Sequence, residues 1–92
     1  MNVLSEEEVR SRLGSLPGWK IEERVLVKIF KFKDFRVALH FVNRVGDIAE
    51  EAGHHPDIDI RYNSVRLGLT THDAGGLTGK DFDLASAAGK LV

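Results

Sequence analysis

The chain has no cysteine among its 92 residues, which excludes disulfides, thiolate metal sites and cysteine nucleophiles. It has no apolar run near the ~20 residues that a membrane span needs, and its opening MNVLSEEEVR lacks the apolar core of a secretory signal. Neither charge is in excess, because 13 basic and 14 acidic residues give a formal net charge of −1. This balance offers no electrostatic surface for nucleic acid or an anionic membrane. We therefore expect a cytoplasmic protein that binds no nucleic acid and no membrane.

The composition indicates one soluble globular domain over residues 1–92. Hydrophobic residues make up 42% of the chain and charged residues 29%, which are the proportions of such a domain. A domain this short buries only a modest fraction of its surface, so self-association would add to its stability.

Three segments carry the signals of helices, and each begins at a residue whose side chain can cap free backbone N–H groups. These capping residues are Ser5, Asp34 and Thr78. Glu8 and Asp81 stand three residues after the first and the third cap, which completes a capping box in each case. The first helix should end near Leu13, and the second should end at Gly53, which occupies the place of a C′ glycine. The buried side of the second helix is predicted from apolar residues at helical spacing: Ala38, Phe41, Val45, Ile48 and Ala52, widened by Val42 and Ala49.

Two pairs of strands separate the helices. In the first pair, Trp19–Ile21 and Leu26–Phe32 are rich in β-branched and aromatic residues, and Glu23-Arg24 is the expected turn. In the second pair, polar residues alternate with apolar ones, namely Ile58, Ile60, Tyr62, Val65, Leu67 and Leu69. The order α-β-β-α-β-β-α predicts an α+β domain, in which three helices pack on one face of a four-stranded antiparallel sheet.

The second hairpin is expected to bring histidines together. Apolar residues should face each other across the two strands, and the tightest loop that allows this has Asn63 and Ser64 at its centre. Extending that register places His72 across from His55, which His54 directly precedes. The sequence therefore predicts a three-histidine cluster at the open end of this hairpin.

Three interpretations of this cluster stay open. Histidine has an unperturbed pKa near ~6.5, so such a cluster suits proton transfer near neutral pH. Three histidines with a carboxylate can also hold zinc, but adjacent histidines on an extended backbone point apart, so we favour a metal-free site. The third interpretation is a solvated loop without chemistry. A plain surface role is what we expect for His40, which lies on the polar side of the second helix.

Two carboxylates could support the histidines. Glu50 lies in the last turn of the second helix, where the helix dipole disfavours negative charge. It is either an ordinary solvated acid or a carboxylate that orients His54 or His55 and raises the pKa of that ring. Asp81 is likewise either a capping-box acid alone or a further support for the histidines.

These residues resemble the pterin-4a-carbinolamine dehydratase family, whose animal members include the dimerization cofactor of a homeodomain transcription factor. The resemblance covers nearly the whole chain and the order of its elements. The spacing that carries it joins Glu50, His54, His55, Pro56, Tyr62, His72 and Asp81. This spacing is much more specific than any one of its parts.

The resemblance implies an enzyme, a hydro-lyase that removes water from 4a-hydroxytetrahydrobiopterin to give quinonoid dihydropterin. In the family, this reaction recycles tetrahydrobiopterin for the aromatic amino-acid hydroxylases, without a metal or cofactor. The resemblance also implies a homodimer or homotetramer. The catalytic residues that it implies are His54, His55 and His72, and the supporting residues are Glu50, Pro56 and Asp81. The implied substrate contacts are Gly53, His54, His55, Thr70, Thr71, His72 and Asp73.

Two positions depart from the family's pattern. Ile58 stands where many members have an aromatic residue, which affects the pocket wall or a subunit contact. Gly53 stands where many members have Asp or Asn. The same site is also compatible with two other functions. One is a pterin-binding or protein-interaction module, similar to a transcriptional coactivator, with little turnover. The other is a role near molybdopterin metabolism.

Overall fold

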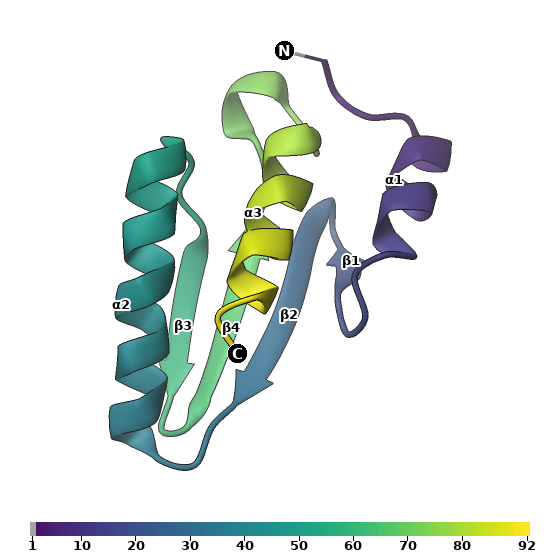
Figure 1. Cartoon of the computed structure of the whole chain (residues 1–92). Coiled ribbons are helices and arrows are strands. Elements are labelled where there is room, and N and C mark those ends of the chain that lie inside the picture. The colour runs from purple at the N-terminus through teal and green to yellow at the C-terminus, as the bar shows by residue number, and fades with distance from the viewer. Residues whose placement is uncertain (1) are drawn as a thin grey trace.

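The computed structural model describes residues 2–92. Its elements, in chain order, are α1 (Glu6–Leu13), β1 (Lys20–Glu22), β2 (Val25–Lys31), α2 (Phe35–Ala52), β3 (Asp57–Arg61), β4 (Ser64–Leu69), the 3₁₀ helix η1 (His72–Ala74) and α3 (Gly79–Gly89) (Figure 1). Every predicted helix and strand is present, and the sequence did not predict η1. The expected Glu23-Arg24 turn joins β1 to β2, with φ angles of 48° and 67°.

The four strands form one antiparallel sheet in the order β1-β2-β4-β3. Helices α2 and α3 lie side by side across one face of this sheet, and α1 lies beside β1 (Figure 1). Val9 and Leu13 of α1 pack against the same core as the other two helices. The predicted α+β architecture is therefore confirmed.

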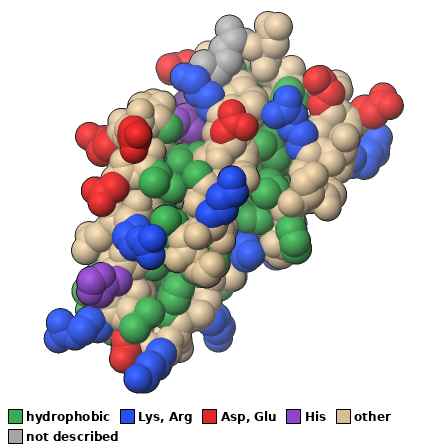
Figure 2. Space-filling view, in the orientation of Figure 1, with side chains coloured by type: hydrophobic (Ala, Val, Ile, Leu, Met, Phe, Trp, Pro, Cys, Tyr) green, Lys and Arg blue, Asp and Glu red, His purple; other side chains and the backbone are tan. Residues whose placement is uncertain are grey.

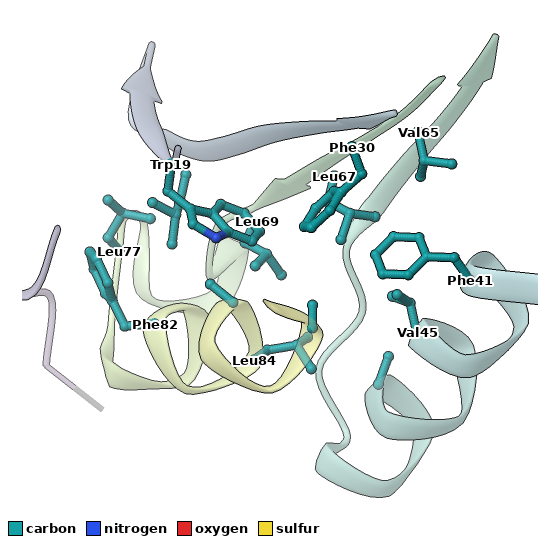
Figure 3. Close-up of a cluster of buried hydrophobic side chains, with 14 of the residues drawn as sticks. Trp19, Phe30, Phe41, Val45, Val65, Leu67, Leu69, Leu77, Phe82 and Leu84 are labelled. Carbon is teal, nitrogen blue, oxygen red and sulfur yellow. The ribbon is translucent and has the colours of Figure 1, made fainter. Parts of the chain in front are cut away.

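The core lies between the sheet and the helices (Figure 3). The ring of Phe41, from α2, lies 4.7 Å from that of Phe30 and 4.9 Å from that of Phe32, measured between centroids. Trp19 meets Phe30 edge-on at 5.9 Å. Aromatic pairs in such geometries add about 0.5–1.5 kcal/mol each beyond the area they bury. The predicted α2 stripe is buried at Ala38, Phe41, Val45 and Ala49, whereas Ala52 at the helix end is exposed.

The predicted helix caps are all present. The Ser5 hydroxyl accepts a hydrogen bond from the Glu8 N–H at 3.1 Å, and Glu8 Oε1 accepts one from the Ser5 N–H at 3.0 Å. Hydrogen bonding to the Ser5 backbone, and secondarily to its hydroxyl, lowers the pKa of Glu8. Asp34 Oδ1 accepts from the Val37 N–H at 2.9 Å and starts α2 in the same way.

The predicted register of the β3–β4 hairpin is wrong by two residues. Ile60 pairs with Val65 and Ile58 with Leu67, so the turn is centred on Tyr62 and Asn63. Tyr62 leaves the ladder, with a φ of 52° and a side chain that is 66% exposed. A shift of two residues keeps every side chain on its own face of the sheet, so the alternation of apolar residues fits both registers.

Contacts outside the hairpin decide this register. The Asn63 side chain donates from Nδ2 to the Phe32 carbonyl at 2.8 Å, and the Phe32 N–H donates to the Asn63 carbonyl at 2.9 Å. These bonds hold Asn63 opposite the end of β2 and thereby fix the position of the turn.

The surface that carries the helices mixes acidic and basic side chains with apolar ones (Figure 2). His40 is exposed there, as expected for the polar side of α2. Within residues 2–92, no helix combines the length and the apolar character needed to cross a membrane.

Candidate active site

One end of the molecule holds the predicted site residues. There α2 ends, β3 begins, β4 continues into η1, and α3 starts (upper end of Figure 1). The ends of α2 and β4 and the starts of β3 and α3 therefore meet in one region.

Helix α2 ends in a left-handed turn at Gly53, and the histidine pair follows directly after this turn. Gly53 has a φ of 65°, and its N–H donates to the Ala49 and Glu50 carbonyls. The His54 N–H donates to the Ala49 carbonyl at 3.1 Å. These bonds form a Schellman motif, which ends a helix and redirects the chain. As a result, His54 and His55 follow the helix end directly and lead into β3.

His54 forms a nearly buried pair with Asp81 at the start of α3. Its Nε2 lies 2.5 Å from Asp81 Oδ1, and the two side chains are only 11% and 0% exposed. The interaction joins residues 27 positions apart in the chain. Since both groups are shielded from water, this pair is held far more firmly than an ion pair on the surface.

The rest of the Asp81 carboxylate is also fully engaged. Its Oδ2 accepts from the Thr71 hydroxyl at 2.8 Å and from the Thr78 N–H at 2.9 Å. The Thr71 and Thr78 hydroxyls are themselves 2.9 Å apart. A buried carboxylate is costly unless its lone pairs are satisfied, and this network satisfies them. Asp81 therefore caps α3 and orients the His54 ring at the same time.

His55 pairs with Glu50, one turn back on α2, through its Nε2 and the Glu50 carboxylate. Both side chains are largely exposed, at 62% and 78%. Water screens such a pair, so it holds the ring much more loosely than Asp81 holds His54. The structure thus assigns the two candidate carboxylates to different histidines.

His72 is the first residue of η1, and its side chain is exposed. The observed hairpin register places Thr70, and not His72, across from position 55. The predicted direct approach of His55 and His72 across the hairpin therefore depended on a register that the hairpin does not adopt. His72 reaches the same end of the molecule through η1, which turns the chain directly after Thr71.

The other predicted contacts differ in how accessible they are. Thr70 and Pro56 are half-buried, while Gly53 and Asp73 are exposed. Thr71 is only 5% exposed, and its carbonyl already accepts from the N–H groups of Ala74 and Gly75. Its side chain is therefore part of the support for Asp81 and faces inward.

Sequence reasoning missed the role of Thr71. The predicted capping box of Thr78 and Asp81 is present. Thr71 was expected only as a substrate contact, yet its hydroxyl donates to Asp81. Neither sequence spacing nor composition indicates which hydroxyl meets which carboxylate. The isolated bridge between Thr71 and Gly76, which closes the intervening loop, brings them together.

A surface cavity of about 260 Å³ reaches His54 between α2 and α3. Lys80 and Asp83 of α3 also line it, although the sequence predicted neither as a site residue. The part of the chain that the structure describes contains no group of three or more His, Cys, Asp or Glu side chains that could hold a metal ion.

Residues 2–91 match the family described as pterin 4 alpha carbinolamine dehydratase. The chain belongs to this pterin carbinolamine dehydratase family. The family resemblance inferred from the histidine spacing is thereby confirmed.

Curated members of the dehydratase family align over nearly the full chain. A protein of Acidobacterium capsulatum is 53% identical over 92 residues, which are 100% of both chains. A protein of Chloroflexus aurantiacus is 54% identical over 89 residues, covering 97% of this chain and 96% of its own. Both bear the name "Putative pterin-4-alpha-carbinolamine dehydratase".

Solved structures show the same fold. A crystal structure described as a transcriptional coactivator/pterin dehydratase from Brucella melitensis has a TM-score of 0.94 at 34% identity, with 98% of each chain covered. A pterin dehydratase-like protein, described as a RuBisCO assembly factor in the alpha-carboxysome, has a TM-score of 0.65 at 22% identity. It covers 79% of this chain and 84% of its own, and it shares the fold alone.

Proposed function

We propose that this protein is a hydro-lyase that converts 4a-hydroxytetrahydrobiopterin to quinonoid dihydropterin and so recycles tetrahydrobiopterin. In this proposal, His54, His55 and His72 carry the protons and bind the pterin. The observation that carries it is the buried pair of His54 and Asp81, in a chain that belongs to a dehydratase family. A buried carboxylate that orients a histidine is a common arrangement in acid–base catalysis.

The reaction requires two proton transfers and no net oxidation. The substrate carries a hydroxyl group and a ring nitrogen on one carbon. The nitrogen lone pair forms a C=N bond as the C–O bond breaks, the oxygen takes up a proton and leaves as water, and the nitrogen loses its own proton. The enzyme must therefore supply one acid and one base, each of which typically contributes about 10²–10⁴-fold to the rate.

His54 is suited to act as the base. An ionised Asp81 only accepts hydrogen bonds, so the neutral His54 ring donates through Nε2 and keeps its proton there. The other ring nitrogen, Nδ1, is then free to accept a proton. We assign His72 to the acid–base work as the partner of His54, and His55 to pterin binding.

The substrate contacts in this proposal come from two short segments. The first is Gly53–His55, which the Schellman turn presents at the end of α2. The second is Thr70–Asp73. The main chain of Thr71 is already hydrogen-bonded within its own loop, so Thr70, His72 and Asp73 would bind the edge of the pterin ring as a neighbouring strand would. Glu50 and Pro56 support the first segment, and Asp81 links it to α3.

The test is a dehydration assay with 4a-hydroxytetrahydrobiopterin. We expect His54→Ala and His72→Ala to lower kcat by about 10²–10⁴-fold, and His55→Ala mainly to raise KM. His40→Ala, an exposed histidine on α2, is the matched control and should keep wild-type rates. Full activity in His72→Ala would refute the histidine assignment. Loss of activity after exhaustive chelation would support zinc instead.

A second candidate function is a protein-interaction or pterin-binding module. The Brucella melitensis structure, described as a transcriptional coactivator/pterin dehydratase, favours this alternative. A complex of fixed stoichiometry with a purified protein, together with no turnover of the carbinolamine, would establish it. A role near molybdopterin metabolism uses the same site, and a molybdopterin precursor tested in the same assay would reveal it.

We further propose that the chain forms a homodimer or homotetramer through β3. This strand is at the edge of the sheet, and its Ile58 is 38% exposed. Asp57 and Asp59 precede Arg61 along β3, so an antiparallel second copy would bring opposite charges together. Light scattering after size exclusion should give an oligomer mass for the wild type and a smaller mass for Ile58→Lys. Ile29→Lys, on another exposed edge, is the control, and a monomeric wild type would refute the proposal.

A further inference from the structure

Strand β2 has an open edge along its second half. Strand β1 pairs only with Val25–Val27, whereas β4 pairs with β2 as far as Lys31. Beyond this ladder, the Phe32 N–H donates toward Asn63, on the β4 side. Main-chain groups alternate in direction along a strand, so those of Ile29 and Lys31 point to the opposite, open side. The main-chain N–H and C=O groups of Ile29 and Lys31 are thus available to pair with a further strand.

A groove runs along this open edge. Its volume is about 710 Å³, and its other walls come from α2 and from the residues after α3. The lining residues are Lys28, Ile29, Phe30, Lys31, Phe32, Val37, His40, Phe41, Arg44, Leu91 and Val92. Ile29 and Val37 offer exposed apolar surface, at 54% and 40% exposure. The groove therefore combines unpaired main chain with apolar contacts.

The charged side chains of the groove are all basic. Lys28, Lys31, Arg44 and the titratable His40 line it, and no Asp or Glu does. Among the described residues, none of these cations forms an ion pair with a carboxylate, and this holds for the carboxylate of Val92 as well. Figure 2 shows mostly basic side chains at this lower end of the molecule. Positive charge is thus concentrated here in a chain whose formal net charge is −1.

Some of these cations also have local partners. Lys28 Nζ donates to the Pro17 carbonyl at 3.2 Å and lies 4.8 Å above the Phe30 ring. Arg44 donates to the Leu91 carbonyl at 3.4 Å. These contacts hold the cations in place, and none of them involves a carboxylate.

We propose that this groove binds an extended, acidic peptide segment of another protein as an additional strand on β2. The main-chain groups of Ile29 and Lys31 would pair with the peptide, and the basic side chains would attract its carboxylates. A second copy of this chain fits poorly, because antiparallel pairing of two β2 edges brings Lys28 and Lys31 close to their counterparts. A small anion is also a poor fit, because it would leave the main-chain groups of Ile29 and Lys31 without partners.

The first test uses a fluorescein-labelled peptide of sequence Glu-Val-Glu-Val-Glu at low ionic strength, with binding followed by fluorescence anisotropy. We expect Lys31→Gln and Arg44→Gln each to weaken binding about tenfold, which corresponds to ~1.4 kcal/mol. Arg36→Gln, which removes an exposed α2 cation outside the groove, is the matched control and should leave binding unchanged. Added salt should weaken binding to the wild type.

The second test locates the peptide. Hydrogen exchange of the Ile29 and Lys31 amides should slow when the peptide binds, because these two N–H groups become paired. Ile29→Pro removes one outward donor without removing a bond to β4, so it should fold and lose binding. If this variant fails to unfold cooperatively on heating, amide exchange in the wild type decides the question.

Three results would overturn the proposal. One is equal binding of Glu-Pro-Glu-Pro-Glu, which cannot form a strand ladder and would indicate a site for anions only. Another is protection at amides other than those of Ile29 and Lys31. The third is equal loss of affinity in Arg36→Gln and Arg44→Gln. All readouts measure binding, so they do not depend on the proposed dehydratase activity.

Discussion

Replacing Asp81 with Asn changes one functional group at the centre of the candidate site. The carboxylate accepts from His54, Thr71 and Thr78, whereas an amide offers one acceptor oxygen and one donor NH₂ group. If the amide oxygen keeps the bonds from the two threonines, the NH₂ group faces His54 Nε2. That nitrogen must then accept, so the ring proton moves to Nδ1 and the proposed base is lost.

The size of this effect follows from the burial of the pair. Forcing the wrong tautomer on a catalytic histidine costs on the order of 10⁴-fold in rate, and one acid–base group typically contributes about 10²–10⁴-fold. We therefore expect kcat of Asp81→Asn to fall by about 10²–10⁴-fold with little change in KM. Charge-assisted bonds become neutral ones, so the free energy of unfolding should fall by only about 1–3 kcal/mol.

Two measurements are made on the wild type and on Asp81→Asn: the rate of dehydration and the position of the proton on the His54 ring. Nitrogen NMR of His54 should show the proton on Nε2 in the wild type and on Nδ1 in Asp81→Asn. Asp47→Asn removes an exposed carboxylate on α2 that lies outside the cavity at His54, and it should behave as the wild type. A folded Asp81→Asn that keeps its kcat, or a loss of equal size in Asp47→Asn, would refute the reasoning.

Two further predictions concern local structure. Gly53→Ala should lower the free energy of unfolding by about 1–2 kcal/mol, because an added Cβ meets nothing within 4 Å and only the strain of the 65° φ remains. Gly53→Asn should cost less, and equal costs in urea denaturation would contradict this account. The lowered pKa of Glu8 stabilises the fold above its unfolded pKa, and this contribution is lost as pH falls through the lowered value. Acidification should therefore lower the Tm of Glu8→Gln less than that of the wild type, and equal decreases would contradict the prediction.

Local features of the fold could be predicted from the sequence because they depend on neighbours in the chain. The capping boxes at Ser5 and Thr78 and the glycine end of α2 involve residues within a few positions of one another. The alternation in β4 also specified the face of this strand that is buried, which carries Val65, Leu67 and Leu69. Such signals are independent of how distant segments pack.

The hairpin register was beyond the reach of the same signals. Period-2 alternation is unchanged by a shift of two residues, so it could not distinguish Asn63-Ser64 from Tyr62-Asn63 as the turn. The choice depends on Asn63 binding Phe32, a residue 31 positions away in the chain.

The sequence by itself determined the three helices, the four strands, the family and the histidines at issue. The spacing of the capping, apolar and histidine residues is a property of the chain alone. This spacing sets the local hydrogen bonds and the side-chain periodicity that define helices and strands. Only the tertiary structure decided that Asp81 holds His54, that Glu50 holds His55, and that Thr71 faces inward. The physical reason is that a carboxylate binds whichever donor the fold brings within reach. The packing of α2 against α3 places Asp81 beside His54, and the turn at the end of α2 returns His55 to Glu50.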